Sequence, residues 1–442
     1  MIRILVFFLA VFLSACSQTA EFRRPLPPVP PVWPEVSETS GLGDLKRTHW
    51  RFFFTDPRLQ ALIELSLENN RDLRIAAGRV EEARAQYGIA RADKGPTVNA
   101  GSDNMQSLMS VSYEVDFWGR IAGLNEAARV AFLATEESRR AVHLSLVADI
   151  ASTYFTLLQM DDVIAFTQSA VDSREKSLAL IEKGRDLGGA YDFEFQQARG
   201  LLESTRASLS ANEHQRAVTV NKLNFLVGQV PGPLPQGRQL DEQGLDADLS
   251  LGLPSEVLLM RPDVMSAEHR LKAAHANIGV ARAAFFPKIV LTAGLGMASQ
   301  GLTGLLSEGA WYFLPAMSAI PLFDGGRTAS SVNVAEARKM VAVAEYEKTL
   351  QQAFREVADL LSLRASLASQ LRSAMASNSA QERRLQIAQA RYGVGLVGYL
   401  EVLDAQRELV SSQQTSTQVR RAQLDAVAQL YKALGGGEKS YE

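Results

Sequence analysis

Two carboxylates near the C-terminus are spaced so that they could act together. Glu401 and Asp404 are three residues apart, and Leu400 and Asp404 are four apart, so on a helix they are neighbours. Where copies of a chain surround a pore, rings of acidic side chains and apolar constrictions select and gate. Two solvated acids on a helix surface would give the same pattern, and the residues alone favour that simpler interpretation.

No motif for catalysis or cofactor binding accompanies these acids. Residues 435–440 (GGGEKS) copy only the end of a nucleotide-binding P-loop. Neither HExxH nor GxSxG occurs, and the five histidines lack ligand spacing. His269 and His275, six residues apart on one expected helix, would point in different directions. The sequence therefore predicts no enzyme, no cofactor and no metal site.

The N-terminus carries a secretory signal followed by a lone cysteine. Residues 1–15 combine Arg3 with an apolar run and with small residues before Cys16. This resembles a bacterial lipoprotein signal, in which Cys16 is acylated after cleavage; an ordinary signal peptide with an incidental cysteine is the less favoured alternative. Ser17 follows it, which by the same resemblance favours the outer membrane. A single cysteine excludes an intrachain disulfide.

The strongest organisational signal is an internal duplication. Asp72 and Pro96 bracket a stretch that returns 191 residues later, between Asp263 and Pro287. Further matched pairs are Gly119 and Gly326, Arg120 and Arg327, Arg199 and Arg407, and Gly228 and Gly436. Such long self-similar units predict two copies of one structure: helix, β-hairpin, long helix, half-length helix. A duplicated unit of this kind suits a symmetric assembly.

The predicted domains follow from this repeat. They are a signal peptide (1–15), a lipidated segment with a Pro-rich stretch (16–55), repeat 1 (56–228), an equatorial linker (229–252), repeat 2 (253–434) and a tail (435–442). Composition leaves two interpretations of the Pro-rich stretch, a stiff strap or a disordered spacer. A net charge of −3 does not indicate a nucleic-acid partner.

Period-two alternation places β-hairpins at about 97–117 and 288–323. The pattern fits tilted membrane strands and soluble half-buried hairpins equally well, and the lipoprotein signal favours the membrane. No apolar run after the signal has the length of a transmembrane helix, so a membrane crossing would have to be a β-barrel. Proline-free stretches from Gly119 to Gly184 and from Gly326 to Gly393 predict two very long helices.

Several motifs resemble outer-membrane factors of the TolC type, in the NodT-like lipoprotein branch that serves resistance–nodulation–division efflux systems. The motifs are YEVDFWGR at 113–120, RPDV at 261–264, FFP at 285–287, PLFDGG at 321–326 and YLEVLDAQR at 399–407. The resemblance covers nearly all of the mature chain. It implies an α+β membrane protein, a homotrimer whose 12-stranded β-barrel (four strands per chain) continues into a long periplasmic α-helical barrel.

The same resemblance implies a passive exit duct for small molecules in a tripartite efflux system. Its partners would be a periplasmic adaptor (membrane fusion protein), an inner-membrane pump and outer-membrane lipid, with no nucleic acid. A type I protein-secretion duct is the alternative within transport. A structural periplasmic lipoprotein without a pore is the alternative from another class.

The resemblance also implies residue roles. Leu400, Glu401 and Asp404 match the periplasmic gate, and the candidate gate partners are Arg407, Asp192 and Glu194. Glycine-rich turns match the tips that dock the adaptor, and the residues assigned to them are Gly184, Gly188, Gly189, Arg391, Tyr392 and Gly395. Glycine is expected in any tight helix–helix turn, so these residues also have a purely structural explanation.

The sequence departs from the family pattern in two places. Val397 lies at or near a position where some members carry a basic residue that ties the inner hairpin to the outer one. In addition, 23 positions separate Pro96 from Gly119, whereas 39 separate Pro287 from Gly326. The first hairpin is therefore shorter by 16 residues, with its tip near Asp103–Asn104. Either a thin barrel edge is tolerated or membrane insertion is impaired.

Overall fold

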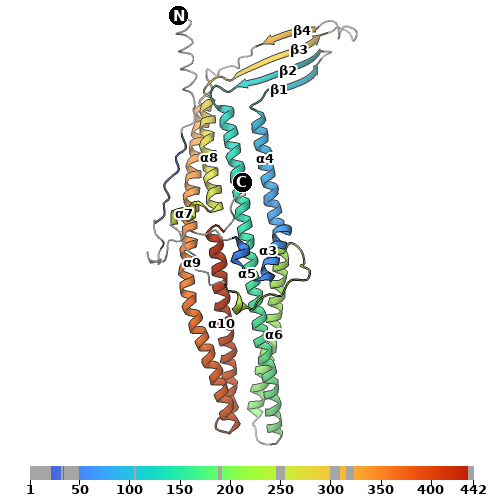
Figure 1. Cartoon of the computed structure of the whole chain (residues 1–442), viewed down its shortest axis with the longest axis vertical. Helices are drawn as coiled ribbons and strands as arrows, with labels where there is room; N and C mark the ends of the chain where they lie inside the picture. Colours follow the sequence, from blue (N-terminus) through green and yellow to red (C-terminus); the bar gives the residue numbers. More distant parts are fainter. Residues whose placement is uncertain are drawn as a thin grey trace. The chain divides into compact units, whose positions relative to one another are not determined.

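The computed structural model describes residues 21–30, 33, 49–103, 106–187, 192–244, 254–298, 309–314 and 323–436. Its helices are α2 (Trp50–Phe53), α3 (Pro57–Asn69), α4 (Arg71–Ala92), α5 (Arg120–Asp186), α6 (Asp192–Val227), α7 (Pro254–Leu259), α8 (Pro262–Ala283), α9 (Arg327–Gly393) and α10 (Tyr399–Ala433), with a 3₁₀ turn η1 (Leu240–Glu242) (Figure 1). The strands are β1 (Thr97–Asp103), β2 (Gln106–Val115), β3 (Ile289–Ala298) and β4 (Gly309–Leu314). The order α4–β1–β2–α5–α6 returns as α8–β3–β4–α9–α10, so the duplication is present in the fold.

The chain divides into two compact units. Unit 1 comprises Met1–Val29, Ile75–Ala141 and Leu259–Gln352, and it holds the four strands. Unit 2 comprises Pro30–Arg74, Val142–Leu258 and Ala353–Glu442. The long helices α5 and α9, of 67 residues each, contribute residues to both units.

The strands of unit 1 form one antiparallel sheet in the order β1-β2-β3-β4. β2 and β3 pair along their whole length, from Gln106 opposite Ala298 to Val115 opposite Ile289, which joins the two hairpins. β1 has seven residues and β2 has ten, and the last pair before the tip is Asp103 with Gln106. The shortened first hairpin therefore forms a regular strand pair. Of the predicted final strand, which was expected to end at Phe323, residues 315–322 lie outside the described part.

An aspartate just before each long helix, Asp116 before α5 and Asp324 before α9, caps the N-terminus of that helix. Asp116 accepts a hydrogen bond from the backbone N–H of Ala122 at 2.7 Å, and Asp324 accepts one from Thr328 at 2.8 Å. Each satisfies a backbone donor that the first helical turn leaves unpaired. Gly119 precedes α5 with φ 71°, a conformation in which a side chain would be strained. The motif that carries the family resemblance thus has a local structural cause.

The expectation that no apolar run of transmembrane length follows the signal was wrong for one stretch of α5. Among the described residues, an 18-residue window of α5 reaches a mean hydropathy of 1.4, and 61% of that window is buried. The physical reason is packing: Val147, Ile150, Tyr154 and Phe155 of α5 belong to the core of unit 2. The hydropathy of this stretch is that of a core helix.

Asp56 ties this core to the segment after α6. It is 1% exposed and accepts hydrogen bonds from the Tyr154 hydroxyl (2.9 Å), the Gln243 amide (2.8 Å) and the backbone N–H groups of Arg238 (2.9 Å) and Arg58 (2.8 Å). Burial by itself raises the pKa of Asp56, but the hydrogen bonds from Gln243, Arg238 and Tyr154 outweigh it and hold the pKa below its usual range. A buried carboxylate with this many donors stays ionised.

Replacing Asp56 with alanine should therefore destabilise unit 2. The substitution leaves buried donors unpaired and should cost about 2–4 kcal/mol, or roughly 5–10 °C in the apparent melting temperature followed by circular dichroism. Asp72→Ala, an exposed acid in the first turn of α4, is the matched control. Because the folded pKa is depressed, the stabilisation is present above the unfolded pKa of about 3.9 and is lost as pH falls through the folded value. Equal melting temperatures for the two variants at neutral pH would contradict this assignment.

Candidate functional site

The turn between α9 and α10 is closed by its own backbone. The N–H of Gly395 donates to the carbonyl of Tyr392, and the N–H of Leu396 donates to that of Arg391, both at 2.9 Å. Gly395 has φ 75°, the left-handed conformation that ends helices in this way. The ring of Tyr399, the first residue of α10, meets that of Tyr392 edge-on at 5.1 Å. This fixed turn sets the register between the last turns of α9 and the first turns of α10.

A small apolar cluster packs the beginning of α10 against its neighbours in unit 2. Its buried members are Ile181, Ala198, Ala388, Tyr399, Val402, Leu403 and Ala405. They come from α5, α6, α9 and α10, so the two helical hairpins meet here. Three of the seven are alanines, and the partly buried side chains of Leu178, Phe195, Leu201 and Leu385 pack against the cluster.

Both candidate gate carboxylates are paired with arginines of the same hairpin. Asp404 lies 2.5 Å from Arg384 and 2.7 Å from Arg407, and Glu401 lies 2.8 Å from Arg391. Arg384 and Arg391 belong to α9, whereas Arg407 lies one turn beyond Asp404 on α10. All five side chains are between 35% and 63% exposed, so each pair contributes only about 0–1 kcal/mol. These ion pairs link α9 to α10 weakly, and the arginines neutralise the charges of Glu401 and Asp404.

Of the three predicted gate partners, only Arg407 contacts a gate carboxylate in the described residues. Arg407 does contact Asp404. Asp192 and Glu194 occupy the first turn of α6, and in the described residues neither is bonded to the α9–α10 arginines. Acids in a first turn complement the helix dipole, which accounts for them without a gate. Arg384 was not anticipated, although the turn centred near residue 395 places 384 opposite 404 and 391 opposite 401.

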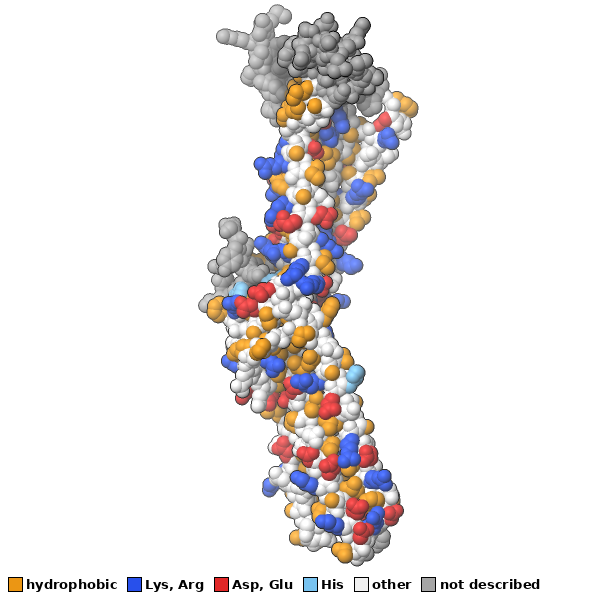
Figure 2. Space-filling view, turned by 90° about the vertical axis from the view of Figure 1, so that its right-hand side faces the viewer, with side chains coloured by type: hydrophobic (Ala, Val, Ile, Leu, Met, Phe, Trp, Pro, Cys, Tyr) orange, Lys and Arg blue, Asp and Glu red, His pale blue; other side chains and the backbone are white. Residues whose placement is uncertain are grey.

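Not all of the residues predicted to form the two tips lie in described turns of the structure. Gly184 lies inside α5, and Gly188 and Gly189 lie outside the described residues, as does Cys16. The two turns instead expose large apolar side chains: Leu187, Phe193, Val394, Leu396 and Leu400 are all more than half exposed. Acidic and basic side chains are interspersed over the lower end of the face in Figure 2. Apolar side chains at a turn, among balanced charges, suit contact with another protein.

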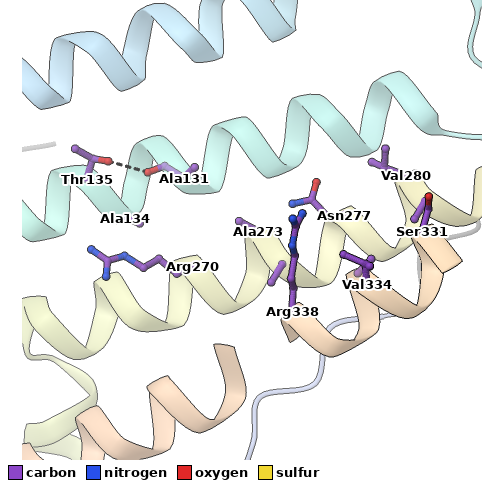
Figure 3. A pocket seen from close by; sticks show the side chains of 13 residues that line it. Ala131, Ala134, Thr135, Arg270, Ala273, Asn277, Val280, Ser331, Val334 and Arg338 are labelled. Atoms are coloured by element: carbon purple, nitrogen blue, oxygen red, sulfur yellow. Dashed lines mark hydrogen bonds between the residues drawn. The ribbon is translucent and has the colours of Figure 1, made fainter. Parts of the chain in front are cut away.

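A hollow of about 630 Å³ in unit 1 lies among α5, α8 and α9 (Figure 3). Arg270 and Arg338 project toward it, and alanines form much of its wall. Its lining contains no histidine, cysteine or carboxylate that could serve as an acid–base or metal-binding partner. Across the described ranges, no group of three His, Cys, Asp or Glu side chains could hold a metal ion. The charged set at the α9–α10 turn remains the better candidate.

Comparison with known proteins agrees with this geometry. The family model described as "Outer membrane efflux protein" matches residues 62–229 and 253–436, one match for each repeat. The cation efflux system protein CusC of Escherichia coli K12 is 38% identical over 98% of this chain and 99% of its own length. The solvent efflux pump outer membrane protein SrpC of Pseudomonas putida is 39% identical, with 97% of each chain covered.

A solved structure shares the fold. The open state of the MtrE outer membrane channel of Neisseria gonorrhoeae superimposes with a TM-score of 0.88 at 33% identity, covering 96% of this chain and 98% of that one. The expected TolC-type architecture, with two repeats and long helices beside a small sheet, is thereby confirmed. The chain belongs to the outer membrane efflux protein family, a family of channels rather than enzymes.

Proposed function

We propose that three copies of this chain form the outer-membrane duct of a tripartite efflux pump that exports small molecules or ions. Channel function is that of the family, and the relatives named above serve cation and solvent efflux. Protein secretion has no counterpart among those names, and a lipoprotein without a pore does not agree with the likeness to an outer-membrane channel. The duct is passive, and its energy comes from inner-membrane partners.

Strand number supports the trimer. Four described strands are too few to enclose a lumen, since about eight only just leave room for filling side chains. Three copies give twelve. Val111 and Tyr113 on β2 are more than a third exposed in the single chain, as lipid-facing side chains of such a barrel would be.

The observation that carries the gating role is the paired charge set at the α9–α10 turn. Three copies of the two carboxylates, six in all, would line one constriction of the trimer, and Arg384, Arg391 and Arg407 offset their mutual repulsion. The constriction is therefore of mixed charge rather than a bare acidic ring. The Arg384–Asp404 pair lies within the α9–α10 hairpin, so it does not replace the tie between hairpins that Val397 cannot make. Weak exposed pairs of this kind hold a gate closed without locking it.

Removing the acids or the arginines should open the duct with opposite ion selectivity. In planar bilayers, Glu401→Ala/Asp404→Ala should raise single-channel conductance and shift selectivity toward anions, because three arginines per chain lose their partners. Arg384→Ala/Arg391→Ala should also open the duct but shift selectivity toward cations. Glu203→Ala, which removes an exposed pair with Arg206 on α6, is the control and should match wild type. The same selectivity for both double variants would place the gate elsewhere.

The exposed turns are proposed to dock the periplasmic adaptor. Leu396→Glu places a charge on a side chain that is 71% exposed and belongs to no core cluster of the described residues. Purified Leu396→Glu should conduct as wild type does, while cells carrying it lose efflux because the adaptor no longer binds. Met375→Glu, at an exposed site within α9, is the matched control and should retain efflux. Full efflux by Leu396→Glu would remove this turn from the docking surface.

Cys16 is proposed to carry the lipid. Phe22 and Arg24, a few residues beyond it, lie against α8: Arg24 pairs with Glu268 at 2.9 Å, and Phe22 lies 5.5 Å from the Lys272 ammonium. This segment is therefore bound to α8 a few residues beyond the proposed anchor. Cys16→Ser should abolish palmitate labelling in cells while leaving the melting temperature of the purified protein unchanged. Persistent labelling would disprove acylation at Cys16.

A further inference from the structure

Arg174 of α5 is a buried cation without a partner. The residue is 6% exposed, and its Nε atom is buried with no hydrogen bond. Within the described part of the chain, Arg174 takes part in no hydrogen bond or ion pair. Burial lowers the pKa of its guanidinium, yet an arginine remains protonated at physiological pH. A buried polar group that is unsatisfied requires an explanation, and a buried charge requires one more strongly.

The acids next to Arg174 in the sequence are engaged elsewhere. Asp172 accepts a hydrogen bond from the Gln168 side chain at 2.8 Å, and Glu175 pairs with Arg206 at 2.6 Å. Arg174 instead lies close to Tyr399, the buried first residue of α10. Arg174 therefore lies at the contact between α5 and the hairpin that carries the paired carboxylates, next to Ser173, which accepts a hydrogen bond from Gln406 of α10.

A second group in the same contact is also imperfectly satisfied. Gln406 of α10 is 7% exposed and donates to the Ser173 hydroxyl at 3.1 Å, but its Oε1 atom is buried without a partner. Among the described residues, three buried polar atoms without a partner therefore lie at the α5–α10 contact, Nε of Arg174 on α5 and, on α10, the Tyr399 hydroxyl and Oε1 of Gln406. The apolar cluster that packs the beginning of α10 contains Tyr399 but neither Arg174 nor Gln406. A contact built only for strength would bury apolar side chains at both positions.

We propose that Arg174 is a positioning residue that destabilises the closed packing of α10 on α5 and so keeps the duct able to open. When α10 moves away from α5, water reaches the buried Nε–H group and its desolvation cost is relieved. The buried charge therefore favours the open state, whereas the arginine–carboxylate pairs of the α9–α10 hairpin favour the closed one. This inference rests on the proposed gate at Glu401 and Asp404.

The test is Arg174→Met, which keeps a long side chain but removes the charge. In single-channel recordings, the ratio of open to closed time should fall by roughly tenfold or more, and the apparent melting temperature should not decrease. Arg216→Met, which removes an exposed arginine of the neighbouring helix α6 that pairs with Asp161, is the matched control and should leave the ratio unchanged. An unchanged or higher open ratio for Arg174→Met would overturn the proposal.

Gln406→Glu provides an independent measurement should Arg174→Met fold poorly. A carboxylate in the α5–α10 contact would give the buried guanidinium a partner, so this variant should also fall in open ratio. Wild-type or increased opening would count against the proposal. If Glu401→Ala/Asp404→Ala opens the duct while neither contact variant affects it, the role of Arg174 is refuted and the gate stands. If none of these variants alters conduction, the gate itself is refuted.

Discussion

The free edges of the four-stranded sheet constrain much else in this molecule. The outer sides of β1 and β4 have no partner strand among the described residues, and in lipid every unpaired backbone N–H and C=O group costs several kcal/mol. Pairing with other copies removes both edges at once. The same symmetry then repeats the α9–α10 turn around one axis. In the proposed trimer, charges that are weakly paired in one chain would become a ring, so assembly in the membrane and gating would have a common origin.

At the proposed ring, carboxylate repulsion and the burial of Arg174 favour opening, whereas ion pairing and apolar packing favour closure. The carboxylates repel one another across the axis, and the arginines of the same hairpin offset this repulsion through exposed pairs worth about 0–1 kcal/mol each. The α5–α10 contact adds apolar packing from residues such as Tyr399 and Val402, reduced by the cost of burying Arg174. No single interaction dominates.

The sequence predicts those features whose cause is local or repeated. Duplicated caps such as Asp116 and Asp324, and the proline-free stretches of α5 and α9, are enough to indicate the repeats and the long helices. Pairing across the α9–α10 turn depends on register, which Gly395 sets and which sequence spacing does not reveal without the centre of the turn. For this reason the sequence did not predict the pairing of Arg384 with Asp404.

Burial is harder still to predict from the sequence. Arg174 lies in a run of polar residues, the usual setting of a surface arginine, and only the packing of α5 on α10 removes it from water. The apolar window of α5 poses the opposite problem, because its composition alone does not say whether it is buried in lipid or in protein. Its hydropathy satisfies the length and composition of a membrane helix, and only the core of unit 2 shows that it packs against protein.

The most direct test of the account is the salt dependence of wild-type single channels in planar bilayers. Raising ionic strength shortens the Debye length from about 10 Å at 0.1 M to about 3 Å at 1 M, which weakens exposed ion pairs. If paired charges at the α9–α10 turn hold the duct closed, open time should increase with salt, and conductance should rise more steeply than bulk conductivity. Open time that is independent of salt, with conductance that only follows the bulk solution, would contradict the account.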